Sequence, residues 1–204
     1  MSATMIIAVI AIAIIFAAGA KINHLMPIGI LGVIGAYILA RTSEYRWKRI
    51  TIFLDPWQDV QGDGWQIIQS LYAISSGGIF GVGIGKSVQK YMYIPEPHND
   101  FIFAILAEEL GLAGVLVVMA LFALFIWRGI TIALKAPDMF GTLVAVGITT
   151  MIGIQAIFSM AVVSSAMPVT GIPLPFFSYG GTALVMLLAS VGVLLNISRH
   201  ATKQ

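Results

Sequence analysis

The chain has 204 residues, of which 59% are hydrophobic and 10% are charged, and its mean hydropathy is +0.96. Soluble globular domains carry about 25% charged residues, so this composition excludes that class and indicates a membrane protein. The chain has no cysteine, which excludes disulfides and cysteine metal sites, and its net charge of +2 comes without the interleaved basic and aromatic pattern of nucleic-acid binders.

Apolar segments follow one another along the chain, and we expect an all-α polytopic membrane protein with one membrane domain over residues 1–204. A helix needs about 20 mainly apolar residues to cross a bilayer. The first stretch is interpreted as a retained span and not as a signal peptide, because residues 1–4 hold no Lys or Arg. Six spans are expected, with five as the alternative: residues 5–20, 22–40, 65–82, 110–127, 140–166 and 176–198.

The distribution of Lys and Arg predicts the orientation, because cytoplasmic loops are enriched in both residues. With six spans, Lys21, Lys86 and Lys90 fall on one side and the other eight basic residues on the opposite side. We therefore expect both termini and the 41–64 connection in the cytoplasm. An outer loop near 83–100 and an outer hairpin near 167–177 follow from the same arrangement.

The stretch IPEPHNDF, residues 94–101, gathers ionisable groups between two apolar segments. One interpretation is structural, with Asn99 or Asp100 as the N-cap of the helix that follows. The other is catalytic, with Asp100 as a general base and with Glu96 and His98 assisting it or helping to hold a divalent cation. A helix N-terminus favours an ionised carboxylate, so both interpretations can hold together.

The stretch GVGIGKS, residues 81–87, does not match a nucleotide-binding loop. Phe80 stands where a Walker A motif needs its first glycine, and Lys86 stands where a dinucleotide fingerprint needs its last. The glycines are interpreted as a backbone turn. Lys86 and Lys90 are candidates for attracting an anionic headgroup or diphosphate.

Two further features are candidates for a site. A carboxylate at the bilayer centre costs about 3 kcal/mol, so Glu108 and Glu109 should lie at the headgroup level or line a water-filled cavity. Residues 167–181 hold prolines that forbid a continuous helix, and Ser178 and Tyr179 could line a cavity there. The structural alternatives are a buried role for the glutamates and a tight turn for the hairpin.

Three long motifs, in this order, resemble one family: DPWQDVQGDGWQIIQSLYAISSGG, YIPEPHNDFIFAILAEELG and PVTGIPLPFFSYGGTALV. Together they are similar to the SEDS proteins (shape, elongation, division and sporulation; the FtsW/RodA/SpoVE type), above all to the FtsW/SpoVE branch. The resemblance covers nearly the whole chain. Asn99 departs from the family pattern, which usually has Thr at this position.

The resemblance implies a multi-pass protein of the bacterial plasma membrane that polymerises lipid II into glycan strands at the outer face. It implies a class B penicillin-binding protein as partner, a divalent cation such as Mg²⁺ and no nucleotide. It assigns catalysis to Asp100, and Lys86, Lys90, Glu96, His98, Glu109, Ser178 and Tyr179 are the candidate substrate-binding residues. Elongation, division and spore-cortex synthesis remain open.

The family has about ten spans, and the chain corresponds to the later ones, so we expect the N-terminal half to be missing. A fragment, a misplaced start and a split protein all fit this expectation. Two other functions stay open: a flippase for lipid-linked precursors, because polar groups within a bundle can shelter a headgroup, and an inactive scaffold that only docks a partner.

Overall fold

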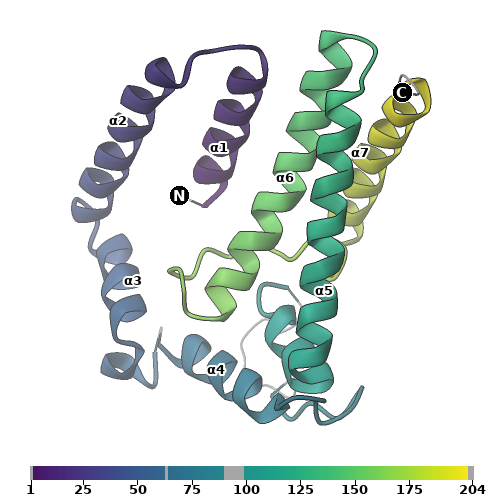
Figure 1. The fold of residues 1–204 in the computed structure, drawn as a ribbon. Helices are drawn as coiled ribbons and strands as arrows, with labels where there is room; N and C mark the ends of the chain where they lie inside the picture. Colours follow the sequence, from purple (N-terminus) through teal and green to yellow (C-terminus); the bar gives the residue numbers. More distant parts are fainter. Residues whose placement is uncertain (1, 63, 90–98, 202–204) are drawn as a thin grey trace.

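The computed structural model describes residues 2–62, 64–89 and 99–201, and every regular element within these ranges is a helix (Figure 1). The expected all-α membrane fold is confirmed. The elements are α1 (Ser2–Ala17), α2 (Ile22–Arg41), α3 (Glu44–Leu54), the short 3-10 helix η1 (Pro56–Asp59), α4 (Trp65–Gly77), α5 (Ile102–Leu134), α6 (Met139–Val163) and α7 (Gly181–His200).

The apolar helices among the described residues are fewer than the six spans expected and agree with the alternative of five when the short α1 is included. Four helices are long and apolar enough to cross a membrane, namely α2, α5, α6 and α7, and the apolar α1 is a shorter fifth with 16 residues. The expected third span is α4, which has only 13 residues. At 1.5 Å per residue α4 reaches about 20 Å, less than a hydrocarbon core of about 30 Å.

Helices α3 and α4 lie at the same end of the bundle as the connection between α6 and α7 (Figure 1). Arg49 of α3 donates a hydrogen bond from Nη1 to the carbonyl oxygen of Val169 at 3.3 Å. Ser70 of α4 donates from Oγ to the carbonyl oxygen of Val163, the last residue of α6, at 3.0 Å. The 41–64 connection and the 167–177 hairpin were expected on opposite sides of the membrane, and these contacts show that expectation to be wrong.

The start of α1 and the end of α7 lie at opposite ends of the bundle. Ile6 of α1 clusters with Ile172 of the hairpin, whereas Leu194 of α7 clusters with Ala133, near the end of α5. This arrangement is incompatible with both termini in the cytoplasm.

The basic residues also lose their value as an orientation signal. By the helices that carry or flank them, the described basic residues divide almost evenly between the two ends: Arg41, Arg46, Lys48, Arg49 and Lys86 at the hairpin end, and Lys21, Arg128, Lys135 and Arg199 at the other.

The core of the bundle is formed by α5 and α6, with α4 and α1 packed beside them. Small residues allow close approach: a Cβ at Gly129 of α5 would lie 2.2 Å from Oγ1 of Thr149 of α6. Contacts between small residues are the usual means of helix association in membranes, where lipid supplies no hydrophobic drive.

Helix α5 is interrupted at Gly111, whose φ of 66° and ψ of −167° are not helical. In an unbroken helix the amides of Leu112 and Ala113 would bond to the carbonyls of Glu108 and Glu109. They donate instead to Gly78 and Ile79 at 2.9 and 3.0 Å. The two released glutamate carbonyls accept from the amides of Val82 and Gly83, both at 3.0 Å. The inserted segment 78–83 thus pairs with all four of these backbone groups, which a helix break at membrane depth requires.

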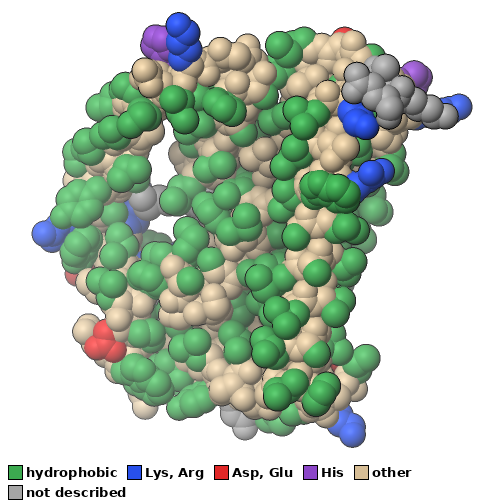
Figure 2. All heavy atoms as spheres, viewed as in Figure 1, with side chains coloured by type: hydrophobic (Ala, Val, Ile, Leu, Met, Phe, Trp, Pro, Cys, Tyr) green, Lys and Arg blue, Asp and Glu red, His purple; other side chains and the backbone are tan. Residues whose placement is uncertain are grey.

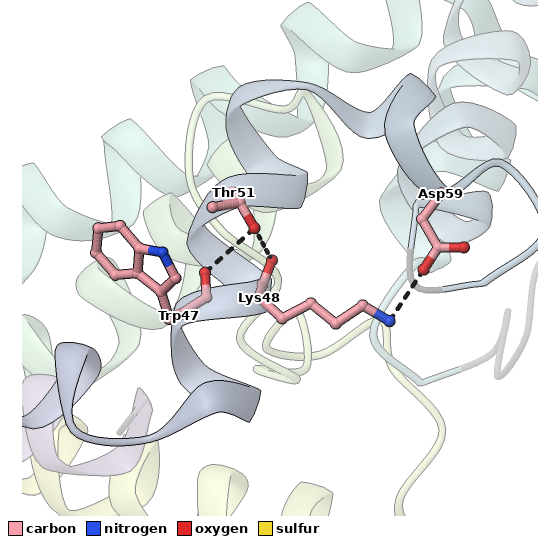
Figure 3. A network of polar contacts seen from close by, with 4 residues as sticks. All are labelled: Trp47, Lys48, Thr51 and Asp59. Atoms are coloured by element: carbon pink, nitrogen blue, oxygen red, sulfur yellow. Dashed lines mark hydrogen bonds and ion pairs between the residues drawn. The ribbon is translucent and has the colours of Figure 1, made fainter.

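The turn between α3 and η1 is fixed by an ion pair between Lys48 and Asp59, whose Nζ and Oδ2 atoms are 3.0 Å apart (Figure 3). Thr51 Oγ1 donates back to the carbonyl of Lys48 at 2.9 Å within the same turn of α3. Both charged side chains are partly exposed, so the pair is worth less than about 1 kcal/mol. The ion pair therefore contributes more to the orientation of α3 relative to η1 than to the stability of the bundle.

Candidate active site

Residues 164–180 connect α6 to α7 without a helix, as their prolines predict. The connection is held against the bundle by buried apolar side chains, since Leu174 belongs to the main core together with Phe101 at the start of α5. A tight turn follows, in which the carbonyl of Leu174 accepts from the amides of Phe177 and Ser178 at 3.3 and 3.0 Å. The predicted hairpin is confirmed.

Asp100 lies next to this hairpin and is partly buried. A Cβ at position 171 would lie 3.3 Å from Oδ2 of Asp100. Gly171 also has a φ of +67°, a conformation that favours glycine. Glycine at this position therefore lets the hairpin backbone come close to the Asp100 carboxylate.

Ser178 joins the hairpin to the residue before Asp100. Its Oγ donates to the carbonyl oxygen of Asn99 at 2.6 Å and accepts from the amide of Leu174 at 2.8 Å. The N-cap of α5 is Phe101, whose side chain makes no capping hydrogen bond. The prediction that Asn99 or Asp100 is the N-cap was wrong, and the backbone before α5 is held by Ser178.

A second polar cluster surrounds Glu108, which is 2% exposed. Its carboxylate accepts from Ser87 Oγ at 2.5 Å, from the Val88 amide at 3.1 Å and from the Gln89 amide at 3.4 Å. These charge-assisted bonds are the stronger class of protein hydrogen bond. They fix residues 87–89, the described residues that precede 90–98, to α5.

The candidate site residues fall into two groups. Asp100 and Ser178 meet at the hairpin. Glu109 lies beside Ser87, whose amide nitrogen is 3.4 Å from Oε1 of Glu109. At the helical rise, Glu109 is about 12 Å along the helix axis from Phe101, so the second group is separate from Asp100. Lys86 is exposed in the loop that leads to this second group.

The remaining candidates are placed differently. Tyr179 is 84% exposed on the hairpin, where it borders a shallow hollow with Ile102. Lys90, Glu96 and His98 lie outside the described residues. Across residues 2–62, 64–89 and 99–201, no three His, Asp or Glu side chains gather in a way that could hold a metal ion.

An apolar groove of about 360 Å³ opens between the α2–α3 side of the molecule and the hairpin, and Figure 2 shows the opening. Residues 167–170 form one wall and lead directly to Gly171 beside Asp100. Arg46 and Arg49 also line the groove, and neither pairs with a carboxylate within the described part of the chain. Most of the remaining lining is apolar: Met5, Ala36, Tyr37, Ala40, Tyr45 and Ile50.

Sequence reasoning missed Arg46 and Arg49 because it placed the 41–64 connection on the other side of the membrane. Their spacing of three residues on α3, which sets them on one helix face, was the available signal. The closeness of Gly171 to Asp100 has no signal in the local sequence.

Comparisons with known proteins identify relatives over nearly the whole chain. The model of the FtsW/RodA/SpoVE family of cell cycle proteins matches residues 1–203. Stage V sporulation protein E of Bacillus subtilis (strain 168) is 54% identical over 93% of this chain and 52% of its own length. A probable peptidoglycan glycosyltransferase FtsW of Geobacter sp. (strain M18) is 46% identical over 97% of this chain and 54% of its own length.

Solved structures show the same fold. A chain from a study of how a peptidoglycan synthase complex coordinates polymerization and crosslinking has a TM-score of 0.74 and 28% identity, over 98% of this chain and 56% of that one. The rod shape determining protein RodA of Thermus thermophilus has a TM-score of 0.59 and 27% identity, over 98% of this chain and 49% of that one. This chain spans about half the length of the curated relatives it matches. It is a multi-pass membrane protein and belongs to the FtsW/RodA/SpoVE family of cell cycle proteins.

Proposed function

We propose that this chain provides the catalytic end of a peptidoglycan glycosyltransferase, which polymerises lipid II at the outer face of the bacterial plasma membrane. The proposal depends mainly on the position of Asp100, a partly buried carboxylate beside the hairpin whose residues 167–170 line the apolar groove. The names of the relatives support the reaction class, because two of them are a probable peptidoglycan glycosyltransferase and a sporulation protein.

The groove supports a lipid-linked substrate. Its apolar walls suit a polyprenyl chain, and the guanidinium groups of Arg46 and Arg49 suit a diphosphate, to which Arg binds with two parallel hydrogen bonds. Wall residues 167–170 lead from the groove to Asp100, so a sugar that follows the diphosphate would reach the carboxylate.

In the proposed reaction, Asp100 accepts the proton of a hydroxyl on the acceptor sugar. The hydroxyl oxygen then forms a bond to the anomeric carbon of the donor, while the bond from that carbon to the diphosphate oxygen breaks. Polyprenyl diphosphate leaves with the bonding electrons, so no nucleotide is required. A positioned general base contributes about 10² to 10⁴ in rate.

The proposal also includes the location of Asp100 at the outer face of the membrane and the identity of a partner protein. The end of the bundle that holds Asp100 must face outwards, because lipid II presents its sugars there. A class B penicillin-binding protein is the proposed partner, supported by the structural neighbour from a complex that couples polymerization and crosslinking.

A divalent cation such as Mg²⁺ is proposed as an additional requirement, but the described residues do not form a site for it. Of the three residues expected to hold the cation, Glu96 and His98 lie outside the described residues and only Asp100 is described. The proposed reaction therefore assigns no step to a cation. Treatment with EDTA should abolish strand synthesis, and added Mg²⁺ should restore it. Full activity in EDTA would remove the requirement.

The test uses this chain joined to the N-terminal half of the Bacillus subtilis relative, purified and supplied with fluorescent lipid II. We expect glycan strands from the unchanged protein and a loss of about 10² to 10⁴ in rate with Asp100→Asn, because an amide cannot accept the proton. Asp138→Asn is the matched control, since Asp138 only caps α6 through the Gly141 amide at 3.1 Å.

Each alternative gives a different result in this assay. Strand synthesis that continues unchanged with Asp100→Asn would refute the general base. Movement of lipid II between leaflets without strands would favour a flippase. Strands made by the 204 residues without an added half would exclude an inactive scaffold.

A further inference from the structure

We propose that Ser178 is a positioning residue for Asp100 and not a substrate-binding residue, an inference that rests on the proposed function. The Ser178 hydroxyl has one proton, and the structure places the carbonyl oxygen of Asn99 2.6 Å from Oγ to accept it. The same oxygen accepts from the amide of Leu174 at 2.8 Å. A hydroxyl with its single proton already donated has none left for a substrate oxygen.

The two bonds connect two segments that are 79 positions apart in sequence. On one side is the turn of the hairpin, which the buried Leu174 fixes in the core. On the other is the peptide group between Asn99 and Asp100. Because that peptide group is planar and rigid, fixing the carbonyl of Asn99 also fixes the starting point of Asp100.

Gly171 is a second place where the hairpin lies close to Asp100. It belongs to the same hairpin as Ser178, and its backbone comes close to Oδ2 of Asp100. Ser178 therefore determines how the hairpin and the Asp100 carboxylate face each other. A shift of about 1 Å in a reacting group can lower a rate by about 10²-fold, so the loss of this bridge should affect the chemical step.

The first test measures kcat and KM separately in the joined protein described above. With Ser178→Ala we expect kcat to fall by about 10- to 100-fold and KM to change by less than about twofold. Ser178→Thr keeps a hydroxyl and should recover most of kcat. Ser178→Cys is nearly isosteric with a weaker donor and should lie between them, which keeps the test valid if the alanine variant does not fold.

The control variant is Ser164→Ala. Ser164 begins the same hairpin, but its hydroxyl donates only to carbonyls of α6, at 2.9 and 3.2 Å. It should leave both constants unchanged. A raised KM with normal kcat in Ser178→Ala would show that Ser178 binds substrate and would overturn the proposal, as would unchanged kcat in both Ser178→Ala and Ser178→Cys.

The second test does not need activity, so it separates failure of this inference from failure of the proposed function. The chain has no cysteine, so Asp100→Cys introduces a single thiol whose reaction with a maleimide can be timed. Adding Ser178→Ala should raise the labelling rate at least about fivefold, the factor that one hydrogen bond of about 1 kcal/mol contributes to a local equilibrium. An equal rate in both proteins would overturn the inference even where the unchanged protein makes strands.

Discussion

Replacing Gly111 by alanine should destabilise the protein, because two separate features of the structure exclude a Cβ at this position. The φ of 66° and ψ of −167° are strained for any residue other than glycine. A Cβ at this position would also lie 2.3 Å from the amide nitrogen of Gly81 and 2.6 Å from the carbonyl oxygen of Ile79. Both atoms belong to backbone, so no side chain can turn away to make room.

The size of the effect follows from the contacts that would be lost. Backbone strain of this kind costs about 1 to 3 kcal/mol. Separating segment 78–83 from α5 breaks four backbone hydrogen bonds, each worth about 0.5 to 1.5 kcal/mol. The lower limits together give a loss of at least about 3 kcal/mol in the free energy of unfolding. On the scale of globular domains of similar size, this corresponds to a decrease in Tm of about 6 °C or more.

The assay is thermal unfolding of the purified protein in detergent, followed by circular dichroism. Gly192→Ala is the matched control, because a Cβ at Gly192 of α7 would have no atom within 4 Å. Alanine is favoured over glycine in a helix by about 1 kcal/mol, so the control should keep or raise Tm. A Gly111→Ala protein with the same Tm as the unchanged chain would refute the account of the helix break.

Two further predictions concern the sidedness of the bundle and the cluster around Glu108. In whole cells, a membrane-impermeant maleimide, which reaches only the outer side, should label Leu54→Cys and Tyr179→Cys and leave Lys135→Cys unlabelled. Labelling of only one of Leu54→Cys and Tyr179→Cys would contradict the arrangement. Glu108→Gln should lower the free energy of unfolding by about 1 to 3 kcal/mol, because a neutral amide weakens the bonds from the three donors that contact the carboxylate. The exposed Glu44→Gln serves as its comparison in chemical unfolding, and equal stability of the two variants would exclude a stabilising role for the buried charge.

The sequence by itself determined the class of protein, the main apolar helices α2, α5, α6 and α7 and the candidate catalytic residue. Hydropathy, helix length and the prolines of the hairpin act through neighbours in the chain, so they can be interpreted without a fold. The motif around Asp100 is likewise a continuous stretch, and the resemblance it carries was confirmed by the family match. Sequence patterns were sufficient to predict the features that depend on contacts between residues close together in the chain.

The tertiary structure decided which segments share an end of the bundle. The apolar pattern of α4 was interpreted as a span, yet its apolar face is buried against α5, because burial in protein and burial in lipid select the same residues. The basic residues of α3 were assigned to the cytoplasm, yet Arg49 contacts Val169 beside the candidate site. No local pattern distinguishes these cases.

The same reason applies to the polar contacts. The backbone exchange around Gly111 and the bridge from Ser178 to Asn99 join residues that are distant in sequence. A hydrogen bond requires its partners within about 3 Å, and only the packing of the helices brings these atoms that close. The sequence thus indicated which carboxylate to examine, and the packed bundle determined what holds it in place.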